Sequence, residues 1–288
     1  MTTSVAVRAR AKLNLWLHVL AKETSGYHTI ETLFHKLELA DDVVVTLAAP
    51  GVREIFCSED VGPAHRNLAY RAAQLYTETQ DWATGFRIGI TKRIPAAGGL
   101  GGGSADAAAT LLALNAMSPR KCNGAELARV GAQLGADVPF MITEALMALA
   151  WGRGDRMLEL PALPQRHVAL VIPAFGIGTA EAYASLTLAD RRLEQITMAD
   201  LTDWNAIAQQ AHNDLAHSLL ALRHGQLGEA STALRAAGAT IAEMTGSGSV
   251  IFGIFESEPD AGALERATGC RVVLTRTALN VEAPRRLD

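Results

Sequence analysis

The stretch Pro95-Ala96-Ala97-Gly98-Gly99-Leu100-Gly101-Gly102-Gly103-Ser104-Ala105-Asp106-Ala107-Ala108 decides how this sequence is interpreted. Five of its residues are glycines within six positions, and a helix-forming run over 107–117 follows at once. Glycine permits positive φ and lets a ligand approach the backbone closely. The unpaired N–H groups and the dipole of a helix N-terminus attract anions. The stretch therefore predicts a phosphate-binding loop rather than a flexible surface loop.

Two common nucleotide-binding loops do not fit this spacing. A Walker A loop requires Gly-Lys-Ser/Thr after its glycines, which is not present here. A dinucleotide-binding fingerprint requires an acidic residue at the end of a second strand about 20 residues further on, and the sequence offers none. The glycine loop thus predicts phosphate binding of another kind.

Length and composition limit the class of protein. The 288 residues are enough for two ordinary domains, and 49% of them are hydrophobic, so a large core is available. The net charge of −4 has the wrong sign for a nucleic-acid-binding protein. No apolar run reaches membrane-spanning length, and the N-terminus lacks the order of a signal peptide. We therefore expect neither a nucleic-acid nor a membrane partner.

The three cysteines, Cys57, Cys122 and Cys270, are far apart in the sequence, and no Cys-x-x-Cys pair exists. Neither a disulfide framework nor a zinc site is indicated. A reducing, cytoplasmic location is the expectation.

Periodicity predicts grouped strands and helices. Residues alternate in hydrophobicity over 5–9, 13–19 and 86–90, which predicts strands, and another extended segment covers 34–47 with an interruption at Asp41-Asp42. Helices are expected over 67–77, 107–117 and 124–134, the last capped by Gly135. A short strand is expected over 146–150.

The segment 161–164 carries two prolines and is the best candidate for a domain boundary. After it we expect strands over 168–172, 250–255 and 271–275, and helices near 179–185, 206–223, 227–237 and 259–267. Grouped strands with helices packed on one side are typical of an α+β protein with two layers in each half. The predicted domains are 1–162 and 163–288.

Four short segments carry polar residues that could perform chemistry. Lys12 and Asn14 share one face of a strand. Ser25-Gly26-Tyr27-His28 is a turn whose aromatic ring and imidazole could stack on a base. Solvent exposure would explain the first pair, and ordinary packing of a capped hairpin would explain the second segment.

Asp137 follows a predicted helix end, and Pro139 favours an extended Val138, so Asp137 is expected at a rigid corner. A structural Asx-turn is the alternative for Asp137. The segment 245–249, Thr-Gly-Ser-Gly-Ser, is a second turn that could bind an anion, although many tight turns have this composition.

Together these segments resemble the GHMP kinase superfamily. Three signatures occur in the right order: Ala-Lys-Leu-Asn at 11–14, Pro-x-x-x-Gly-Leu-Gly at 95–101, and Gly-Ser-Gly at 246–248. Within the superfamily, AKLNLWLHV, SGYHTIETLFHKLELAD, GGLGGGSADAA and LGADVPF resemble the kinases that act on 4-diphosphocytidyl-2-C-methyl-D-erythritol. The resemblance extends from about residue 7 to residue 275.

The resemblance implies a fold and a reaction. The fold would have an N-terminal domain like domain 2 of ribosomal protein S5 and a ferredoxin-like C-terminal domain, with the site in the cleft between them. The reaction would transfer the γ-phosphate of ATP, with Mg²⁺, to the 2-hydroxyl of the methylerythritol moiety, in the non-mevalonate route to isoprenoids. The implied partners are small molecules, and the chain could be a monomer or a homodimer.

The resemblance also assigns site residues by position. Asp137 would be the catalytic base, and Lys12 would be its charged neighbour. The residues implied on the ATP side are Pro95, Gly98, Gly99, Leu100, Gly101, Gly102, Gly103, Ser104, Asn67 and Lys92. Those implied on the acceptor side are Asn14, Tyr27, His28, Thr179 and Tyr183, with Gly246, Ser247 and Gly248 as a possible phosphate-side turn. Metal ligands are not assigned, and Ala105 stands where many relatives have a second serine.

Two alternative functions remain open from the sequence. One is another GHMP kinase, acting on homoserine or phosphomevalonate, although such an acceptor would not require the Tyr27-His28 pair. The other is a catalytically silent nucleotide-binding module that regulates a partner, although such a module has no need of both Lys12 and Asp137.

Overall fold

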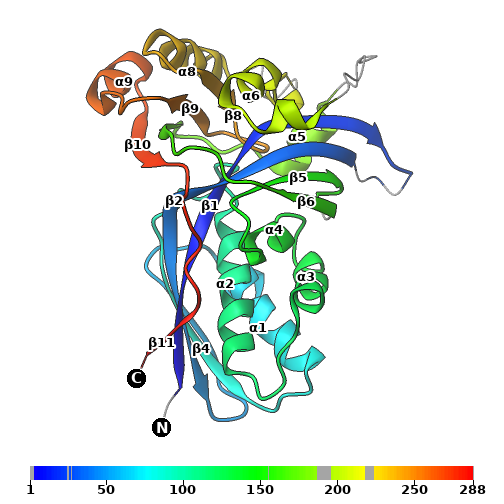
Figure 1. Cartoon of the computed structure of the whole chain (residues 1–288). Helices are drawn as coiled ribbons and strands as arrows, with labels where there is room; N and C mark the ends of the chain where they lie inside the picture. The colour runs from blue at the N-terminus through cyan, green and yellow to red at the C-terminus, as the bar shows by residue number, and fades with distance from the viewer. Residues whose placement is uncertain are drawn as a thin grey trace.

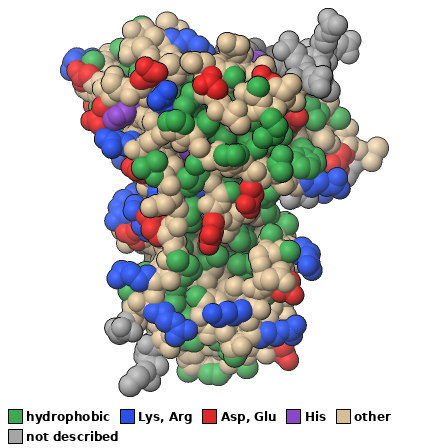
Figure 2. All heavy atoms as spheres, viewed as in Figure 1, with side chains coloured by type: hydrophobic (Ala, Val, Ile, Leu, Met, Phe, Trp, Pro, Cys, Tyr) green, Lys and Arg blue, Asp and Glu red, His purple; other side chains and the backbone are tan. Residues whose placement is uncertain are grey.

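The computed structural model describes residues 3–24, 26, 28–154, 156–186, 196–217 and 224–287. Figure 1 shows two layered halves, one above the other, with strands β1 and β2 extending through both. On the face shown in Figure 2, basic and acidic side chains are interspersed, and neither sign of charge dominates. None of the helices that the structure describes is both long and apolar enough to cross a membrane.

The larger sheet is built on two long paired strands, β1 (Ser4–Lys22) and β2 (His28–Ala48). Buried and more exposed residues alternate at the start of β1, as predicted for 5–9. Residues 9–17 are all buried, so the prediction of a single buried face over 13–19 is wrong. The sheet order is β11-β1-β2-β4-β3. In addition, β5 pairs with residues 30–35 of β2, and β6 pairs with β5. The remaining strands of this sheet are β3 (Arg53–Cys57), β4 (Gly85–Thr91), β5 (Met147–Gly152), β6 (Arg156–Leu160) and β11 (Arg285–Leu287).

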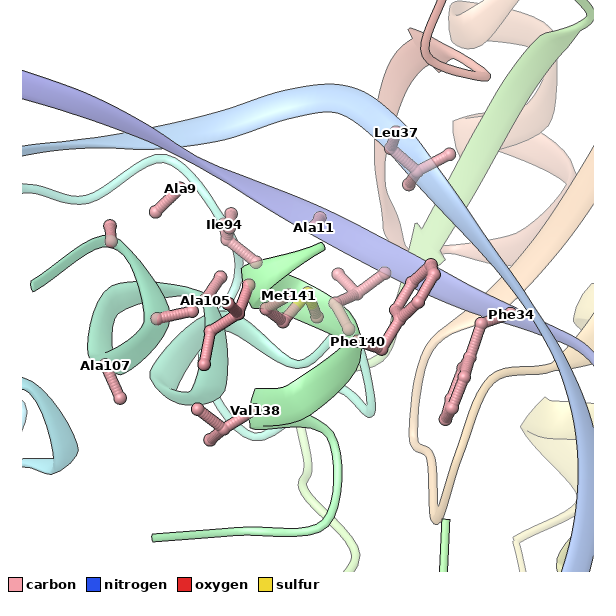
Figure 3. Packing of buried hydrophobic residues seen from close by; sticks show 14 of the residues in the cluster. Ala9, Ala11, Phe34, Leu37, Ile94, Ala105, Ala107, Val138, Phe140 and Met141 are labelled. Carbon is pink, nitrogen blue, oxygen red and sulfur yellow. The ribbon is translucent and has the colours of Figure 1, made fainter. Parts of the chain in front are cut away.

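Helices α1 (Leu68–Thr79), α2 (Gly102–Met117), α3 (Gly124–Ala132) and α4 (Val138–Ile142) cover one face of this sheet. The alanine-rich face of α2 lets the helix lie close to β1, where Ala9 and Ala11 are also small (Figure 3). The rings of Phe34 and Phe140 stack beside them, with centroids 5.0 Å apart. This packing fixes where the N-terminus of α2 points.

The smaller sheet has the order β10-β7-β9-β8, and all of its pairs are antiparallel. Its strands are β7 (His167–Ile172), β8 (Ile241–Met244), β9 (Ile251–Phe255) and β10 (Arg271–Arg276), with α8 (Gly225–Ala236) and α9 (Ala261–Thr268) between them. The chain order β7-α8-β8-β9-α9-β10 is the βαββαβ pattern of a ferredoxin-like fold. The predicted α+β class and ferredoxin-like second half are confirmed.

Shorter elements complete the described chain: η1 (Ala64–Arg66), α5 (Thr179–Ala184), η2 (Met198–Leu201), α6 (Trp204–Gln210) and η3 (Asp214–His217).

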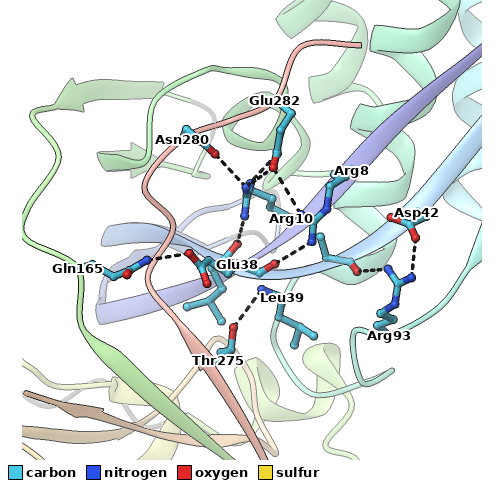
Figure 4. A network of polar contacts seen from close by, with 12 residues as sticks. Arg8, Arg10, Glu38, Leu39, Asp42, Arg93, Gln165, Thr275, Asn280 and Glu282 are labelled. Atoms are coloured by element: carbon cyan, nitrogen blue, oxygen red, sulfur yellow. Dashed lines mark hydrogen bonds and ion pairs between the residues drawn. The ribbon is translucent and has the colours of Figure 1, made fainter. Parts of the chain in front are cut away.

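The two halves of the chain pack against each other. One buried cluster contains Leu13 of β1 together with Val168 of β7 and Phe252 of β9. The C-terminal segment returns to the first sheet, where Glu282 accepts from Arg10 at 2.8 Å (Figure 4). The predicted boundary after residue 162 falls between β6 and β7 and stays a prediction.

Three local predictions in the first half of the chain are wrong. Asp41-Asp42 does not interrupt β2, because Asp41 is buried and its carboxylate accepts from the backbone N–H groups of Arg93 and Ile94. Helix α3 ends at Ala132 and is capped by Gln133, not by Gly135. Residue 138 is not extended, since Pro139 occupies the first turn of α4, where a proline is tolerated.

The helix expected over 206–223 is also wrong. Helix α6 ends at Gln210, and a 3-10 turn follows at Asp214–His217. Asn213 between them is fully buried, and its side-chain N–H₂ donates to the Met244 and Gly246 carbonyls. Residues 218–223 lie outside the described part of the chain.

Candidate functional site

A cavity of about 350 Å³ opens over the glycine loop. Every residue that the resemblance assigned to ATP lines it: Asn67, Lys92, Pro95, Gly98, Gly99, Leu100, Gly101, Gly102, Gly103 and Ser104. The lining also includes Val61, Arg66 and Asp106, which sequence reasoning did not assign. The cavity therefore brings together two separate stretches of the first half, 61–68 and 92–106.

The N-terminus of α2 faces this loop. The helix begins at Gly102, earlier than expected, and Gly101 is its N-cap with φ 72°. Among the described side chains none caps this end, and the first intrahelical bond runs from the Ala105 N–H to the Gly101 carbonyl. The N–H groups of residues 102–104 are therefore left for a ligand, and the helix dipole favours an anion there.

Gly99 is required by both its conformation and its surroundings. Its φ is 77°, and a Cβ on it would lie 2.0 Å from the carbonyl oxygen of Thr245. Thr245 precedes the Gly-Ser-Gly turn, so the two glycine-rich segments are in direct contact. The sequence placed these segments 140 positions apart or more and gave no sign of this contact.

Lys12 lies at the junction of these segments. The β1–β2 register shifts on both sides of it, between Arg10 and Lys12 and again between Asn14 and Trp16. Such irregularities bend a strand and redirect its side chains. The Lys12 ammonium is buried and donates to the Asn14 side-chain carbonyl at 2.6 Å and to the Gly99 carbonyl at 2.7 Å.

Asp137 forms an ion pair with Lys12. Its carboxylate lies 3.5 Å from the Lys12 Nζ and is about a third exposed, at 30%. Asp137 occupies the N-cap position of α4, but in the described structure its side chain makes no capping bond, so the Asx-turn alternative does not hold. Burial lowers the pKa of Lys12 below its ordinary value, and the Asp137 carboxylate opposes that shift.

Asn14 is more enclosed than its expected role in acceptor binding suggests. Its side chain is 3% exposed. The side-chain N–H₂ donates to the Thr32 hydroxyl at 2.8 Å, and the side-chain carbonyl accepts from Lys12 and from the Thr245 hydroxyl at 3.3 Å. These contacts assign Asn14 to the support of Lys12. Its contact with an acceptor stays a prediction.

Lys92 lies in a buried cluster at the edge of the cavity. Its ammonium donates to Asp41 at 2.5 Å and to Asp106 at 2.7 Å. Burial lowers the pKa of Lys92, but Asp106 and Asp41 together raise it above its ordinary value. Burial raises the pKa of Asp106 to about 7, against the effect of Lys92. Local sequence patterns do not reveal this cluster, because its two carboxylates lie on separate elements, β2 and α2.

Replacing Lys92 with methionine is expected to destabilise the fold by about 3–5 kcal/mol, because two carboxylates would remain buried without a cation. The loss should shrink as the pH falls, since a protonated Asp106 needs no cation. Urea unfolding at several pH values measures both effects. Arg87→Met is the control, because the Arg87–Glu54 pair is exposed and should contribute about 1 kcal/mol or less. Equal losses in the two variants would contradict the cluster's role.

Two of the acceptor-side residues, His28 and Tyr183, lie in contact with each other. The rings of His28 and Tyr183 stack with centroids 4.9 Å apart, at an interplanar angle of 27°. Burial, and then the Asp137 carboxylate, raise the pKa of Tyr183 to about 12. Burial, and then the charge of Lys22, lower the pKa of His28 below its ordinary value. Tyr27 lies outside the described residues.

The Gly-Ser-Gly turn closes the site from the second half. The Thr179 hydroxyl lies 2.9 Å from the Ser247 hydroxyl. A Cβ on Gly246 would lie 3.3 Å from the Lys12 Nζ, so the turn directly adjoins the ammonium, and Gly248 has a φ of 79°. Thr179, Gly246, Ser247 and Lys12 thus meet, although they come from both halves of the chain.

Comparisons with known proteins agree with this architecture. The sequence family described as GHMP kinases N terminal domain matches residues 67–145, and GHMP kinases C terminal matches residues 197–272. The 4-diphosphocytidyl-2-C-methyl-D-erythritol kinase of Shouchella clausii (strain KSM-K16) is 38% identical over 258 residues, covering 88% of this chain and 86% of that protein. The protein of the same name from Pelotomaculum thermopropionicum (strain DSM 13744 / JCM 10971 / SI) is 36% identical, covering 95% and 98%.

Solved structures extend the comparison. A crystal structure of 4-(cytidine 5'-diphospho)-2C-methyl-D-erythritol kinase superposes with a TM-score of 0.77 at 36% identity, covering 94% of this chain and 98% of that one. Homoserine kinase from Cytophaga hutchinsonii ATCC 33406 superposes with a TM-score of 0.72 at 17% identity, covering 99% and 97%. At that identity the second likeness shows a shared fold alone.

Proposed function

The chain belongs to the GHMP kinase family, among the 4-diphosphocytidyl-2-C-methyl-D-erythritol kinases, and from that premise we propose how its residues perform the reaction. It is an ATP-dependent kinase that phosphorylates the 2-hydroxyl of this acceptor in the non-mevalonate route to isoprenoid precursors. The single observation that carries the residue assignment is the Lys12–Asp137 pair, 3.5 Å apart, with Lys12 bound to the glycine loop at Gly99.

The glycine loop would bind the phosphates of ATP. The N–H groups at the start of α2 are available donors, and the cavity they line has room for the nucleotide's charged end. Asn67 and Lys92 also line that cavity and would contact the nucleoside. Phosphoryl transfer depends mainly on positioning and charge stabilisation, because its transition state is loose.

Asp137 would take the proton of the acceptor's 2-hydroxyl as the hydroxyl oxygen attacks the γ-phosphorus, and the bond from that phosphorus to the β–γ bridging oxygen would break to release ADP. Its carboxylate is accessible, whereas the adjoining Lys12 is buried, so the base faces the substrate and the cation stands behind it. Lys12 would keep Asp137 ionised and would stabilise negative charge on the transferring group. His28 and Tyr183 would hold the cytosine beside this pair by stacking.

The residues fit a Mg²⁺ ion that is held largely by ATP. Within the described residues no group of three or more His, Cys, Asp or Glu side chains could hold a metal by itself. Kinases usually bind Mg²⁺ through one or two carboxylates together with phosphate oxygens and waters. Asp106 lines the cavity, and its Oδ1 has no hydrogen-bond partner among the described residues, so Asp106 and Ser104 would hold the ion. When bound, Mg²⁺ would neutralise part of the negative charge of the ATP phosphates.

An assay of ADP release tests the acceptor. With Mg²⁺ and ATP present, turnover is expected with 4-diphosphocytidyl-2-C-methyl-D-erythritol and not with homoserine or mevalonate phosphate. Turnover with a control acceptor alone would keep the ATP site and overturn the roles of His28 and Tyr183. ATP binding without turnover on any acceptor would indicate the silent module.

His28→Ala is expected to raise the KM for the acceptor about tenfold, because a ring stack is worth roughly 0.5–1.5 kcal/mol beyond its buried area. The KM for ATP should stay near the wild-type value, since His28 does not line the glycine-loop cavity. Steady-state kinetics with each substrate varied in turn measures the difference. His167→Ala, on β7 beside Glu258, is the control and should change neither constant. A similar rise in both constants for H28A would argue against a cytosine contact.

A further inference from the structure

Thr245 connects the second sheet to the reacting groups of the first half. It is fully buried and lies just after β8, at the start of the Gly-Ser-Gly turn. Its hydroxyl oxygen accepts from the backbone N–H of Asn14 at 3.1 Å. The same hydroxyl lies 3.3 Å from both the Asn14 side-chain carbonyl and the Gly99 carbonyl, to which it can donate.

These two carbonyls are also the acceptors that bind the Lys12 ammonium, at 2.6 and 2.7 Å. Lys12 has three N–H groups, and its Nζ also lies 3.5 Å from the Asp137 carboxylate as an ion pair. The position of the Lys12 ammonium therefore depends on where the Asn14 side-chain carbonyl and the Gly99 carbonyl lie. Besides Lys12 itself, the Thr245 side chain contacts both of them.

Thr245 is itself held on both sides. The side-chain N–H₂ of Asn213 donates to the Met244 carbonyl at 2.6 Å and to the Gly246 carbonyl at 2.8 Å. Asn213 is fully buried, and its side-chain carbonyl accepts from the Leu215 N–H. The backbone around Thr245 thus has little freedom, and a hydroxyl on a fixed backbone positions its partners well.

We propose that Thr245 is a positioning residue for phosphoryl transfer: through Asn14 and Gly99 it fixes the Lys12 ammonium against Asp137. The proposal rests on the function proposed above for Lys12 and Asp137. It makes the chemistry of the first half depend on the docked turn of the second sheet. Thr245 does not contact the substrates in this arrangement, because its hydroxyl is enclosed by protein groups.

Thr245→Val removes the hydroxyl and keeps the shape of the side chain. Misplacing a catalytic group by about 1 Å can cost roughly 100-fold in rate, so kcat is expected to fall about 100-fold. The KM for ATP should stay near the wild-type value, because the N-terminus of α2 is unchanged. Thr245→Ser keeps the hydroxyl and should recover most of the lost kcat.

Thr268→Val is the matched control. Thr268 is also buried, and its hydroxyl donates to the Leu264 carbonyl in α9, away from the site. It should lower stability as T245V does and leave kcat unchanged. Thr245→Ala serves if the valine variant does not fold, and the same loss of kcat is expected. A wild-type kcat in T245V or T245A, an equal loss in T245S, or an equal loss in T268V would overturn the proposal.

A second measurement separates this proposal from the proposed function. In protein with ¹⁵N-labelled lysine, the buried Lys12 ammonium should give a resolved side-chain NMR signal, which Lys12→Met identifies by its loss. The signal should shift or broaden in T245V and remain in T245S and T268V. An unchanged signal in T245V would overturn the positioning role whichever acceptor the enzyme uses. A changed signal in an enzyme without the expected turnover would instead count against the assigned acceptor.

Discussion

Asp137→Asn is expected to lower kcat by about 10³-fold, because an amide cannot take the proton of the acceptor hydroxyl and general-base catalysis typically contributes 10²–10⁴-fold. ATP should still bind, since Asp137 does not line the glycine-loop cavity. The loss of the carboxylate should also lower the pKa of Lys12 further, because Asp137 is what opposes the effect of burial. Turnover is measured by ADP release, and binding by calorimetry with a non-hydrolysable ATP analogue.

The fold should tolerate this change. In the described structure the Asp137 side chain caps no helix, and asparagine has the same shape. Asp260→Asn, at the N-cap of α9, is the matched control and should leave kcat unchanged, because asparagine caps a helix as well as aspartate does. Near-wild-type turnover in D137N would remove Asp137 from the role of base.

Gly99→Ala is expected to reduce kcat/KM by more than about 100-fold. The Cβ would lie 2.0 Å from the Thr245 carbonyl oxygen, so either the loop or the turn must move. Because the Gly99 carbonyl accepts from Lys12, any such movement also displaces the ammonium, and about 1 Å of displacement is enough for this loss. Kinetics and ATP-analogue binding should both be impaired, in contrast with D137N.

Backbone strain alone does not explain the expected loss. Gly269→Ala tests this, because Gly269 also has a positive φ, 64°, but a Cβ there meets nothing within 4 Å. That variant should lose roughly 1–2 kcal/mol of stability and keep its activity. If G99A were as active as G269A, the contact between the glycine loop and the Thr245 turn would be dispensable.

Local patterns predicted the elements well where one segment contains the whole signal. Alternation in β1 and β4, and the glycines that open α2, are read within a few residues, and the structure has them there. The prediction failed where a distant partner decides the conformation. Asp41 reads as a turn residue, yet it stays in β2 because the backbone N–H groups of Arg93 and Ile94 and the Lys92 ammonium bind its carboxylate.

For the candidate site, too, some features follow from local sequence and others only from tertiary contacts. The sequence by itself determined the fold class, and it predicted a phosphate-binding loop and the residue types of the site, since these follow from short motifs and from resemblance. The tertiary structure alone decided that Lys12 meets Asp137, that Gly99 packs on Thr245, and that Asn14 turns toward Lys12. These contacts join residues more than 80 positions apart, or depend on shifts in strand register, and both are set by packing across the two sheets rather than by local preference.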